Sequence, residues 1–459
     1  MSELKRKTAR AIAVEVLNRC DPRTDYAGPI LDKLVGQTEQ RQRATDLVYG
    51  SLRNFITIDK VIETFSGRRC KRIPGKLLNI IRVGVYEIIY SPSTEVYAIV
   101  NEAVENAKTL AGKKQVGFVN AVLREIIRHI TNRQVELSRV NEKNTVVQNS
   151  ETGCEFDTAF LPDGKANPAA YLSIVFSLPQ WLVEDWLAEF GFEQTRQVCL
   201  ASNRRPSIYL RPNTLKITVQ ELAEKLHNQN VDCEVMEEMI KLKSPKTVSE
   251  LPGFAEGLFV VQDITASKPV RLLNPQSEWT ILDLCAAPGT KTTQLAETTG
   301  DLGIVVATDI DSRRLDLITE NTTRLGLKSI KIVTYDKFPI ITTEIGDFDA
   351  ILLDVPCSNT GVLAKRVEAR YRLNQKAIES LAKTQMELLE KAVELIQPQG
   401  RICYSTCSIQ MMENSKLIRE FLRKHPGFVL ENEQLILPSA SDSDCDGGYT
   451  AILKNTKKS

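Results

Sequence analysis

Two cysteines 50 residues apart each follow a short apolar segment. Cys357 lies in the segment Asp354-Val355-Pro356-Cys357-Ser358, and Cys407 lies in Ser405-Thr406-Cys407-Ser408. Because both apolar segments have the character of buried strands, we expect both thiols at the carboxyl edge of a parallel sheet. Two thiols suit methylation of cytosine at carbon-5, which is a poor nucleophile. A thiolate that adds to carbon-6 turns the ring into a reactive enamine, so this chemistry needs a cysteine beside a methyl donor.

A second group of residues at predicted strand ends fits a nucleoside methyl donor. The loop 285–291 carries small residues that let its backbone approach a ligand above the next helix's N-terminus. It lacks the GxGxxG pattern, which disfavours a dinucleotide. Asp309 lies 20 residues beyond Gly289, the usual spacing for a carboxylate that binds ribose, and Asp336 could accept from an adenine amino group. The alternative for any single aspartate is a loop cap.

We therefore expect S-adenosylmethionine, a nucleoside without phosphates, as the donor. The predicted donor-binding residues are Cys285, Ala286, Ala287, Pro288, Gly289, Thr290, Lys291, Asp309, Asp336 and Asp354.

Composition places the chain among soluble globular proteins. Its 459 residues suggest two or three domains, and 42% are hydrophobic and 25% charged. No apolar run approaches the ~18 residues of a membrane span. The ten cysteines show no CxxC pairs and there are only three histidines, which argues against a disulfide framework or a metal site. The N-terminus resembles a helix start and not a signal peptide, so we expect a cytoplasmic protein with reduced thiols.

The net charge of +1 conceals an uneven distribution. Residues 1–140 carry 24 Lys and Arg against 15 Asp and Glu, an excess of nine positive charges, and the remainder carries 35 against 43. A basic N-terminal third on an otherwise acidic chain predicts an anionic partner such as RNA. The alternative is a solvated helical surface.

Residues 1–135 show helical periodicity throughout, for example over 95–111 and from Gly117 to Ile130. The segment 66–76 breaks this pattern and predicts a loop. It concentrates basic side chains, which could contact phosphates or simply be solvated. These side chains are Arg68, Arg69, Lys71, Arg72 and Lys76.

Two further intervals lie between the helical region and the cysteine motifs. Residues 136–168 are polar and aperiodic, which predicts a mobile linker. Residues 169–256 predict a small α+β domain, with a helix that starts at Pro179 and stops at Gly191. A strand at 207–211 and a capping-box helix from Thr218 follow in the same interval.

From residue 257 to 459, strands alternate with helices and acidic residues stand at strand ends. Five such strands predict a doubly wound, Rossmann-like parallel sheet. A last strand at 449–453 should pair antiparallel with a strand near Leu435. The expected fold is therefore multidomain: all-α, then small α+β, then α/β.

The motifs resemble those of the Sun (Fmu, RsmB) family of bacterial 16S rRNA cytosine-C5 methyltransferases. The resemblance rests on the loop 285–291 and both cysteine motifs, and extends to 82–86 and 100–104, which are similar to a NusB-like helical domain. The stretches 210–216 and 261–263 resemble the family's middle segment. Thr290 replaces a usual Gly and Val355 a usual Ala, and neither change removes a functional group.

The resemblance implies a role for each catalytic residue. Cys407 would attack carbon-6, Cys357 would assist release of the product, and Asp354 would hydrogen-bond the N3 and amino edge of the base. Lys291 is a candidate cation for lowering a thiol pKa, because a free thiol is only slightly ionised at neutral pH. The alternative makes Cys357 the attacking residue, as in DNA cytosine methylases.

Two other functions remain open at this stage. The substrate could be tRNA or another RNA, because the basic N-terminal region predicts RNA affinity without specifying the RNA. The chain could also be an assembly or antitermination factor that retains a methylase domain, although the intact thiol pair argues against this. We expect 16S rRNA as the partner, no membrane or metal, and a monomer.

Overall fold

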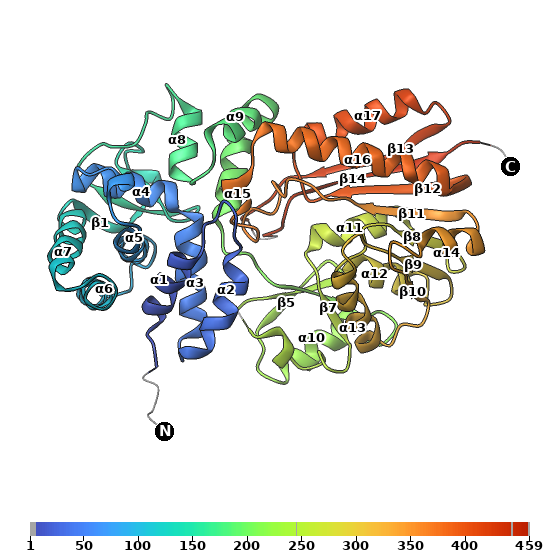
Figure 1. Cartoon of the computed structure of the whole chain (residues 1–459), viewed down its shortest axis with the longest axis horizontal. Helices are drawn as coiled ribbons and strands as arrows, with labels where there is room; N and C mark the ends of the chain where they lie inside the picture. Colours follow the sequence, from blue (N-terminus) through green and yellow to red (C-terminus); the bar gives the residue numbers. More distant parts are fainter. Residues whose placement is uncertain (1–5, 245, 442–443, 458–459) are drawn as a thin grey trace. The chain divides into compact units, whose positions relative to one another are not determined.

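The computed structural model describes all residues except 1–5, 245, 442–443 and 458–459. The chain forms two compact units (Figure 1). The helical unit contains Met1–Arg205 and Leu363–Arg372, and the α/β unit contains Pro206–Val362 and Leu373–Ser459. Within the described part of the chain, no helix is both long enough and apolar enough to span a membrane.

The helical unit is built around α5 (Gly75–Tyr90), which is buried on almost every side. A helix that is apolar all round requires neighbours on all sides, and other helices surround it. These are α1 (Ala9–Arg19), α3 (Arg41–Arg53), α4 (Phe55–Ser66), α6 (Val96–Ala111) and α7 (Lys113–Arg128), and α2 (Ala27–Leu34) packs on α1 and α3. The predicted all-helical character is confirmed, although α7 ends before Ile130, which begins a strand.

The interval 136–168 is not the mobile linker that its polar sequence predicts. It contributes to an antiparallel sheet of order β1-β3-β2. The strands are β1 (Ile130–Glu136), β2 (Thr145–Val147) and β3 (Thr152–Phe156). Val146, Cys154 and Phe156 are fully buried in the core of the helical unit. The prediction failed because each of these short strands contains too few apolar residues to produce a periodic pattern in the sequence.

Arg133 of β1 fastens this sheet to the end of α5. Its guanidinium donates to the carbonyl oxygens of Ile88 at 2.9 Å, Ser91 at 2.9 Å and Thr94 at 2.8 Å. Carbonyl groups at a helix C-terminus have no partner within the helix, so a cationic side chain there satisfies them. The sheet is therefore an integral part of the unit.

The helical unit also includes α8 (Pro168–Val175) and α9 (Gln180–Asn203), which the sequence assigned to a domain at 169–256. Gly191 interrupts α9 with a left-handed φ of 74°, at the position where the sequence predicted a helix end. The segment Leu363–Arg372, which ends in α15 (Ala369–Arg372), returns to this unit from a distant part of the chain.

Arg370 anchors the returning segment. Its side chain is fully buried and donates to the carbonyl oxygens of Arg53 and Ser202, both at 2.8 Å, and to Asn203 Oδ1 at 2.7 Å. Burial lowers the pKa of Arg370 to about 10. The guanidinium therefore stays protonated at neutral pH, and its hydrogen bonds compensate for its desolvation.

In the α/β unit, a four-stranded antiparallel sheet has the order β5-β6-β4-β7. Its strands are β4 (Tyr209–Pro212), β5 (Cys233–Met236), β6 (Met239–Leu242) and β7 (Phe259–Val261). Helix α10 (Val219–His227) packs on this sheet and starts with the predicted capping box of Thr218 and Glu221. Because β7 pairs with β4, the sheet extends past residue 256, where the sequence placed a domain boundary.

The second sheet has the order β10-β9-β8-β11-β12-β14-β13. The first five of these strands are parallel, and β14 and β13 are antiparallel additions, with Leu435 opposite Tyr449. The predicted doubly wound sheet and its terminal hairpin are confirmed. The strands are β8 (Thr280–Asp283), β9 (Ile304–Ala307), β10 (Ile330–Ile332), β11 (Phe348–Asp354), β12 (Ile396–Thr406), β13 (Phe428–Ile436) and β14 (Gly448–Asn455).

Helices cover both faces of this sheet (Figure 1). One face packs against α11 (Ile264–Leu273), α12 (Thr290–Thr298) and the end of α13 (Leu315–Leu325). The other packs against α14 (Phe338–Ile345), α16 (Gln375–Leu395) and α17 (Ser415–Lys424). Alternate residues of β11 face the two layers, with Leu352 in one core and Leu353 in the other. This arrangement leaves the carboxyl edge of the strands for the motif loops.

Replacing Arg370 by Met should lower the free energy of unfolding of the helical unit by about 1–3 kcal/mol, because buried carbonyl groups lose their donor. Urea unfolding followed by circular dichroism measures this change. Arg366→Met, at an exposed position of the same segment, is the matched control. Equal unfolding midpoints for the two variants would show that Arg370 does not anchor the segment.

Candidate active site

The pairing of β11 with β12 brings the two cysteine motifs together. The strands are parallel, and after a register shift near Phe348 they pair without interruption from Ala350 to Asp354, which lies opposite Ser405. The chain then turns into two adjacent loops, and Cys357 Sγ lies 3.1 Å from Cys407 Sγ. Gly361 N donates to Cys407 O at 2.9 Å and holds the loops side by side. A Cβ on Gly361 would lie 2.5 Å from Gly447 O, so only glycine fits there.

The two thiols have different surroundings. The pKa of Cys357 is raised well above its usual value, first by the hydrogen bond with Cys407, then by burial and by the negative charges of Cys407 and Glu413. Cys357 is therefore held as a neutral thiol. Cys407 contacts Asn359 Oδ1 at 3.2 Å, and Asn359 Nδ2 donates to Cys357 O at 2.9 Å. Asn359 has a left-handed φ of 61°, a conformation that asparagine tolerates better than most residues.

Asp354 and Lys291 form an ion pair next to the thiols. Lys291 Nζ lies 2.7 Å from Asp354 Oδ2, and Ser405 Oγ donates to Asp354 Oδ1 at 2.9 Å. Burial disfavours the charge on Lys291, but the charge of Asp354 and the hydrogen bond to it outweigh burial and raise the lysine's pKa. Lys291 is therefore cationic, and its closest negative partner is a carboxylate and not a thiolate.

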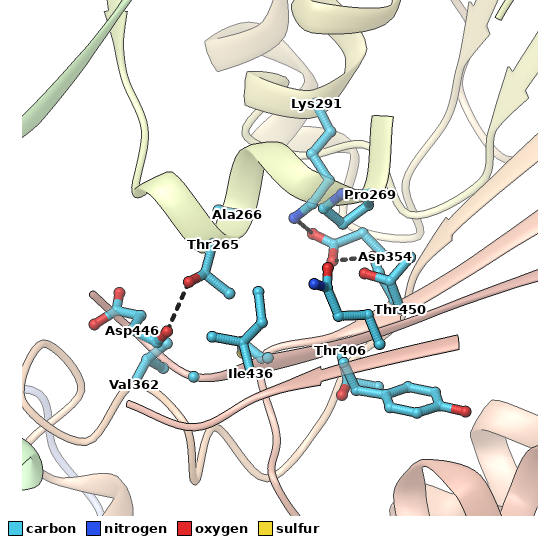
Figure 2. Close-up of a pocket in the computed structure, with 16 residues that line it drawn as sticks. Thr265, Ala266, Pro269, Lys291, Asp354, Val362, Thr406, Ile436, Asp446 and Thr450 are labelled. Carbon is cyan, nitrogen blue, oxygen red and sulfur yellow. Dashed lines mark hydrogen bonds and ion pairs between the residues drawn. The ribbon is translucent and has the colours of Figure 1, made fainter. Parts of the chain in front are cut away.

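A pocket opens beside this ion pair (Figure 2). Lys291, Asp354 and Cys407 line one part of it, and Figure 2 shows Lys291 pointing toward Asp354. On the other side, Thr265 Oγ1 donates to Asp446 O at 2.8 Å, a hydrogen bond drawn in Figure 2. Cys407 is among the residues lining this pocket and Cys357 is not, for the part of the chain that is described.

The loop 285–291 lies between β8 and α12. Ala286 and Ala287 are buried, Cys285 and Thr290 are half-buried, and Pro288 is exposed. Gly289 adopts a left-handed φ of 96°, and a Cβ there would lie 3.1 Å from Ile318 Cγ2. This turn needs glycine. The loop brings the N-terminus of α12 to the carboxyl edge of the sheet.

Asp283 is a carboxylate of this edge that the sequence prediction did not select. It ends β8, is 1% exposed, and its Oδ2 accepts from Thr292 Oγ1 at 2.7 Å. Its Oδ1 is buried and makes no hydrogen bond. Burial is the largest cause that raises the pKa of Asp283 to about 7. Its position at a strand end, directly before the loop, was the signal that could have identified it.

The other two predicted carboxylates differ in burial. Asp309 is 5% exposed, and its oxygens accept from Ala287 N at 3.1 Å and Asp311 N at 3.0 Å. It therefore braces the loop 285–291, as a loop cap does. Asp336 is exposed beyond β10, and its pKa is lowered chiefly by a hydrogen bond from Thr334. No three His, Cys, Asp or Glu side chains in the described ranges are placed to hold a metal ion.

Three family models match successive parts of the chain. NusB matches residues 7–128, the ferredoxin-like domain of RsmF/B-like methyltransferases matches 178–249, and 16S rRNA methyltransferase RsmB/F matches 270–450. The second match spans the boundary between the two compact units, because it includes α9 as well as β4, β5 and β6.

Full-length relatives agree with these matches. A probable ribosomal RNA small subunit methyltransferase B from Synechocystis sp. is 31% identical over 97% of this chain and 96% of its own length. The ribosomal RNA small subunit methyltransferase B of Yersinia pseudotuberculosis is 32% identical over 91% of this chain and 90% of its own length. The crystal structure of PH0851 superposes with a TM-score of 0.73 at 26% identity, covering 97% of this chain and 99% of that one. The chain therefore belongs to the ribosomal RNA small subunit methyltransferase B family.

Proposed function

We propose that this protein transfers a methyl group from S-adenosylmethionine to carbon-5 of a cytosine in 16S ribosomal RNA. The observation that carries the proposal is the pair of thiols 3.1 Å apart, with Cys407 opening into a pocket that Asp354 and Lys291 also line. A methyltransferase that acts on oxygen or on an exocyclic nitrogen needs no thiol. Two thiols beside an ion pair suit an aromatic carbon that must first be activated.

The carboxyl edge of the sheet fits the donor. S-adenosylmethionine is cationic at its sulfonium and ammonium groups, and the unpaired, buried Oδ1 of Asp283 is a suitable acceptor for a cationic group. Asp309, just beyond the end of β9, is the candidate for the ribose hydroxyls, while Asp336 is the candidate for the adenine amino group. The tight turn at Gly289 lets the backbone approach the ligand. When bound, the donor supplies an electrophilic methyl group.

In the proposed reaction, Cys407 attacks as a thiolate. Its electron pair forms a bond to carbon-6 of the base, and the electrons of the 5,6 double bond move toward N3. Carbon-5 is thereby made nucleophilic and takes the methyl group, with release of S-adenosylhomocysteine. In the adduct Cys407 is a neutral thioether, so its charge no longer raises the pKa of Cys357. Cys357 can then lose its own proton to water and, as a thiolate, accept the proton from carbon-5. The electrons of that carbon–hydrogen bond re-form the 5,6 double bond and the sulfur–carbon bond breaks, which restores the aromatic ring and the Cys407 thiolate.

The ion pair orients the base. Asp354 accepts a hydrogen bond from the amino group of the cytosine, and Ser405 and Lys291 hold its carboxylate in place. The cationic Lys291 offsets the negative charge that moves onto N3 in the adduct. A cytosine stacked in a helix has to be unstacked to enter the pocket, which costs a few kcal/mol.

The helical unit supplies a surface for the RNA backbone. The five basic side chains of the segment 66–76 are all exposed. In the described structure none of them has a carboxylate partner, unlike Arg82 and Lys108 nearby. Phosphate contacts by unpaired cations give strong, salt-dependent affinity without sequence specificity. The 16S assignment rests on the names of the relatives, and tRNA is the alternative.

The roles proposed for the two thiols predict opposite results for their alanine variants. Cys407→Ala should abolish methylation and form no covalent complex with RNA. Cys357→Ala should still attack and methylate, but should stall before elimination, so that protein accumulates as an RNA adduct. The adduct is measured as an RNase-sensitive slow band on a denaturing gel. Cys403→Ala, which removes a buried thiol of β12, the strand that precedes Cys407, is the control.

Two outcomes would revise the mechanism. Adduct in Cys407→Ala and none in Cys357→Ala would exchange the roles of the thiols. Methylation by both variants with no trapped RNA would exclude covalent catalysis.

The substrate is tested separately in a deletion strain. Bisulfite sequencing should reveal one or more 16S rRNA cytosines that lose protection in the deletion strain and regain it when the gene is restored. Loss of protection in tRNA, with 16S rRNA unchanged, would show that tRNA is the substrate.

The raised pKa of Asp283 leads us to expect that the stability of the protein depends on pH. Its pKa is about 7 in the folded protein and near 3.8 in the unfolded chain, so the folded state binds more protons between these values. Stability should therefore fall as pH rises from 4 to 7. Asp283→Asn should remove part of this fall, measured by urea unfolding at pH 5 and pH 8. Asp316→Asn, at an exposed site, is the control; if it and Asp283→Asn flatten the profile equally, Asp283 is not responsible.

A further inference from the structure

Glu413 is a fully buried carboxylate that neither the motifs nor the proposed reaction uses. It ends the short 3-10 helix Met411–Glu413, six residues beyond Cys407. Its carboxylate has no Lys, Arg or His partner within the described residues. Burying a carboxylate without a cation lowers the stability of the folded protein unless several hydrogen-bond donors satisfy it. The donors to Glu413 therefore indicate what it does.

The donors to Glu413 come from both cysteine loops. Oε1 accepts from Ser358 N at 2.8 Å, and Oε2 accepts from the hydroxyl of Ser358 and from Ser408 Oγ at 2.5 Å. Ser358 directly follows Cys357, and Ser408 directly follows Cys407. The two hydroxyl oxygens lie 3.0 Å apart. One carboxylate thus bridges the residues adjacent to the two thiols.

Gln385 of α16 completes the arrangement. Its Nε2 donates to Glu413 Oε1 at 3.0 Å and to Pro356 O at 2.9 Å, on the other side of Cys357. The backbone of Glu413 is fixed as well, because its carbonyl accepts from the hydroxyl of Tyr404 at 2.6 Å. Cys357 is therefore flanked by two residues that Glu413 and Gln385 hold, and the Cys407 loop is tied to the same carboxylate.

We propose that Glu413 is a positioning residue that holds the Cys357 thiol against the Cys407 sulfur during catalysis. This inference rests on the two-thiol reaction proposed above. All four hydrogen bonds of the carboxyl group come from groups next to the two cysteines or from Gln385. Its charge also helps to raise the pKa of Cys357, after the larger effects of Cys407 and burial. Glu413 would therefore position Cys357 and add to the effects that keep it protonated while Cys407 attacks.

A buried carboxylate with a purely structural role would have a different consequence. Its loss would lower stability but leave the relative reactivity of the two thiols unchanged. Glu413→Gln distinguishes the two roles, because it keeps the shape of the side chain and removes the charge. Its amide also cannot accept from both serine hydroxyls and the Ser358 N–H as the carboxylate does.

The first measurement uses the full-length protein without RNA. Alkylation of Cys357 and Cys407 by iodoacetamide is followed at several pH values by mass spectrometry of the two peptides. In the parent, the raised pKa of Cys357 should confine its alkylation to high pH. In Glu413→Gln, the profile of Cys357 should shift to lower pH. Glu420→Gln, at an exposed site on α17, should leave both profiles unchanged.

The second measurement is the single-turnover rate of methylation. In Glu413→Gln it should fall roughly 10- to 100-fold, as expected for misplaced reacting groups, with unchanged affinity for S-adenosylmethionine. Ser408→Ala removes one donor and should lower the rate less, which keeps the test available if Glu413→Gln fails to fold. Alkylation profiles and rates equal to the parent's, in whichever of these variants folds, would overturn the proposal.

Failure of the proposed function would have a separate signature. Parent protein that releases no tritium from RNA labelled at cytosine carbon-5 would refute the cytosine chemistry. The alkylation profiles involve no substrate, so they would still decide whether Glu413 controls the thiol pair.

Discussion

The pairing of β11 with β12 is the constraint on which the site depends. Five consecutive backbone pairs, from Ala350–Arg401 to Asp354–Ser405, align the ends of these central strands, and both cysteines follow within three residues of the last pair. A slip of one residue would move every side chain of one strand to the other face of the sheet. Burial in two different cores prevents such a slip, because Ile351 and Leu353 pack on one layer of helices while Ala350 and Leu352 pack on the other.

Two cations lie against carboxylates at the carboxyl edge of the described sheet, because Arg314 is 3.7 Å from Asp309 and Lys291 is 2.7 Å from Asp354. Lys291 is paired with Asp354, while Asp283 is buried without a cationic partner in contact and Glu413 is satisfied by neutral donors alone. Two buried carboxyl groups of this edge therefore have no cation in contact among the described residues, which suits a cationic methyl donor. The pKa of Cys357 is raised first by its hydrogen bond with Cys407, then by burial and by the charges of Cys407 and Glu413, which opposes a second thiolate beside the first.

The path of the chain connects the site covalently to the helical unit. The Cys357 loop ends at Val362, and the next ten residues belong to the helical unit. They are held there by Arg370 and by Glu368, whose carboxylate accepts from Ala27 N at 2.9 Å.

The sequence alone was sufficient for the features that short-range patterns determine. The alternation of strands and helices from β8 to β12, the terminal hairpin and the capping box at Thr218 all depend on neighbours a few residues apart. The motif residues could be selected for the same reason, since parallel strand ends meet at one edge. Only the tertiary structure decided the sheet within 130–156, the return of 363–372 to the helical unit, and the burial of Asp283 and Glu413. A polar residue shows no periodic signal when it is buried, because its burial depends on donors brought from distant parts of the chain, as Ser358 and Gln385 are brought to Glu413.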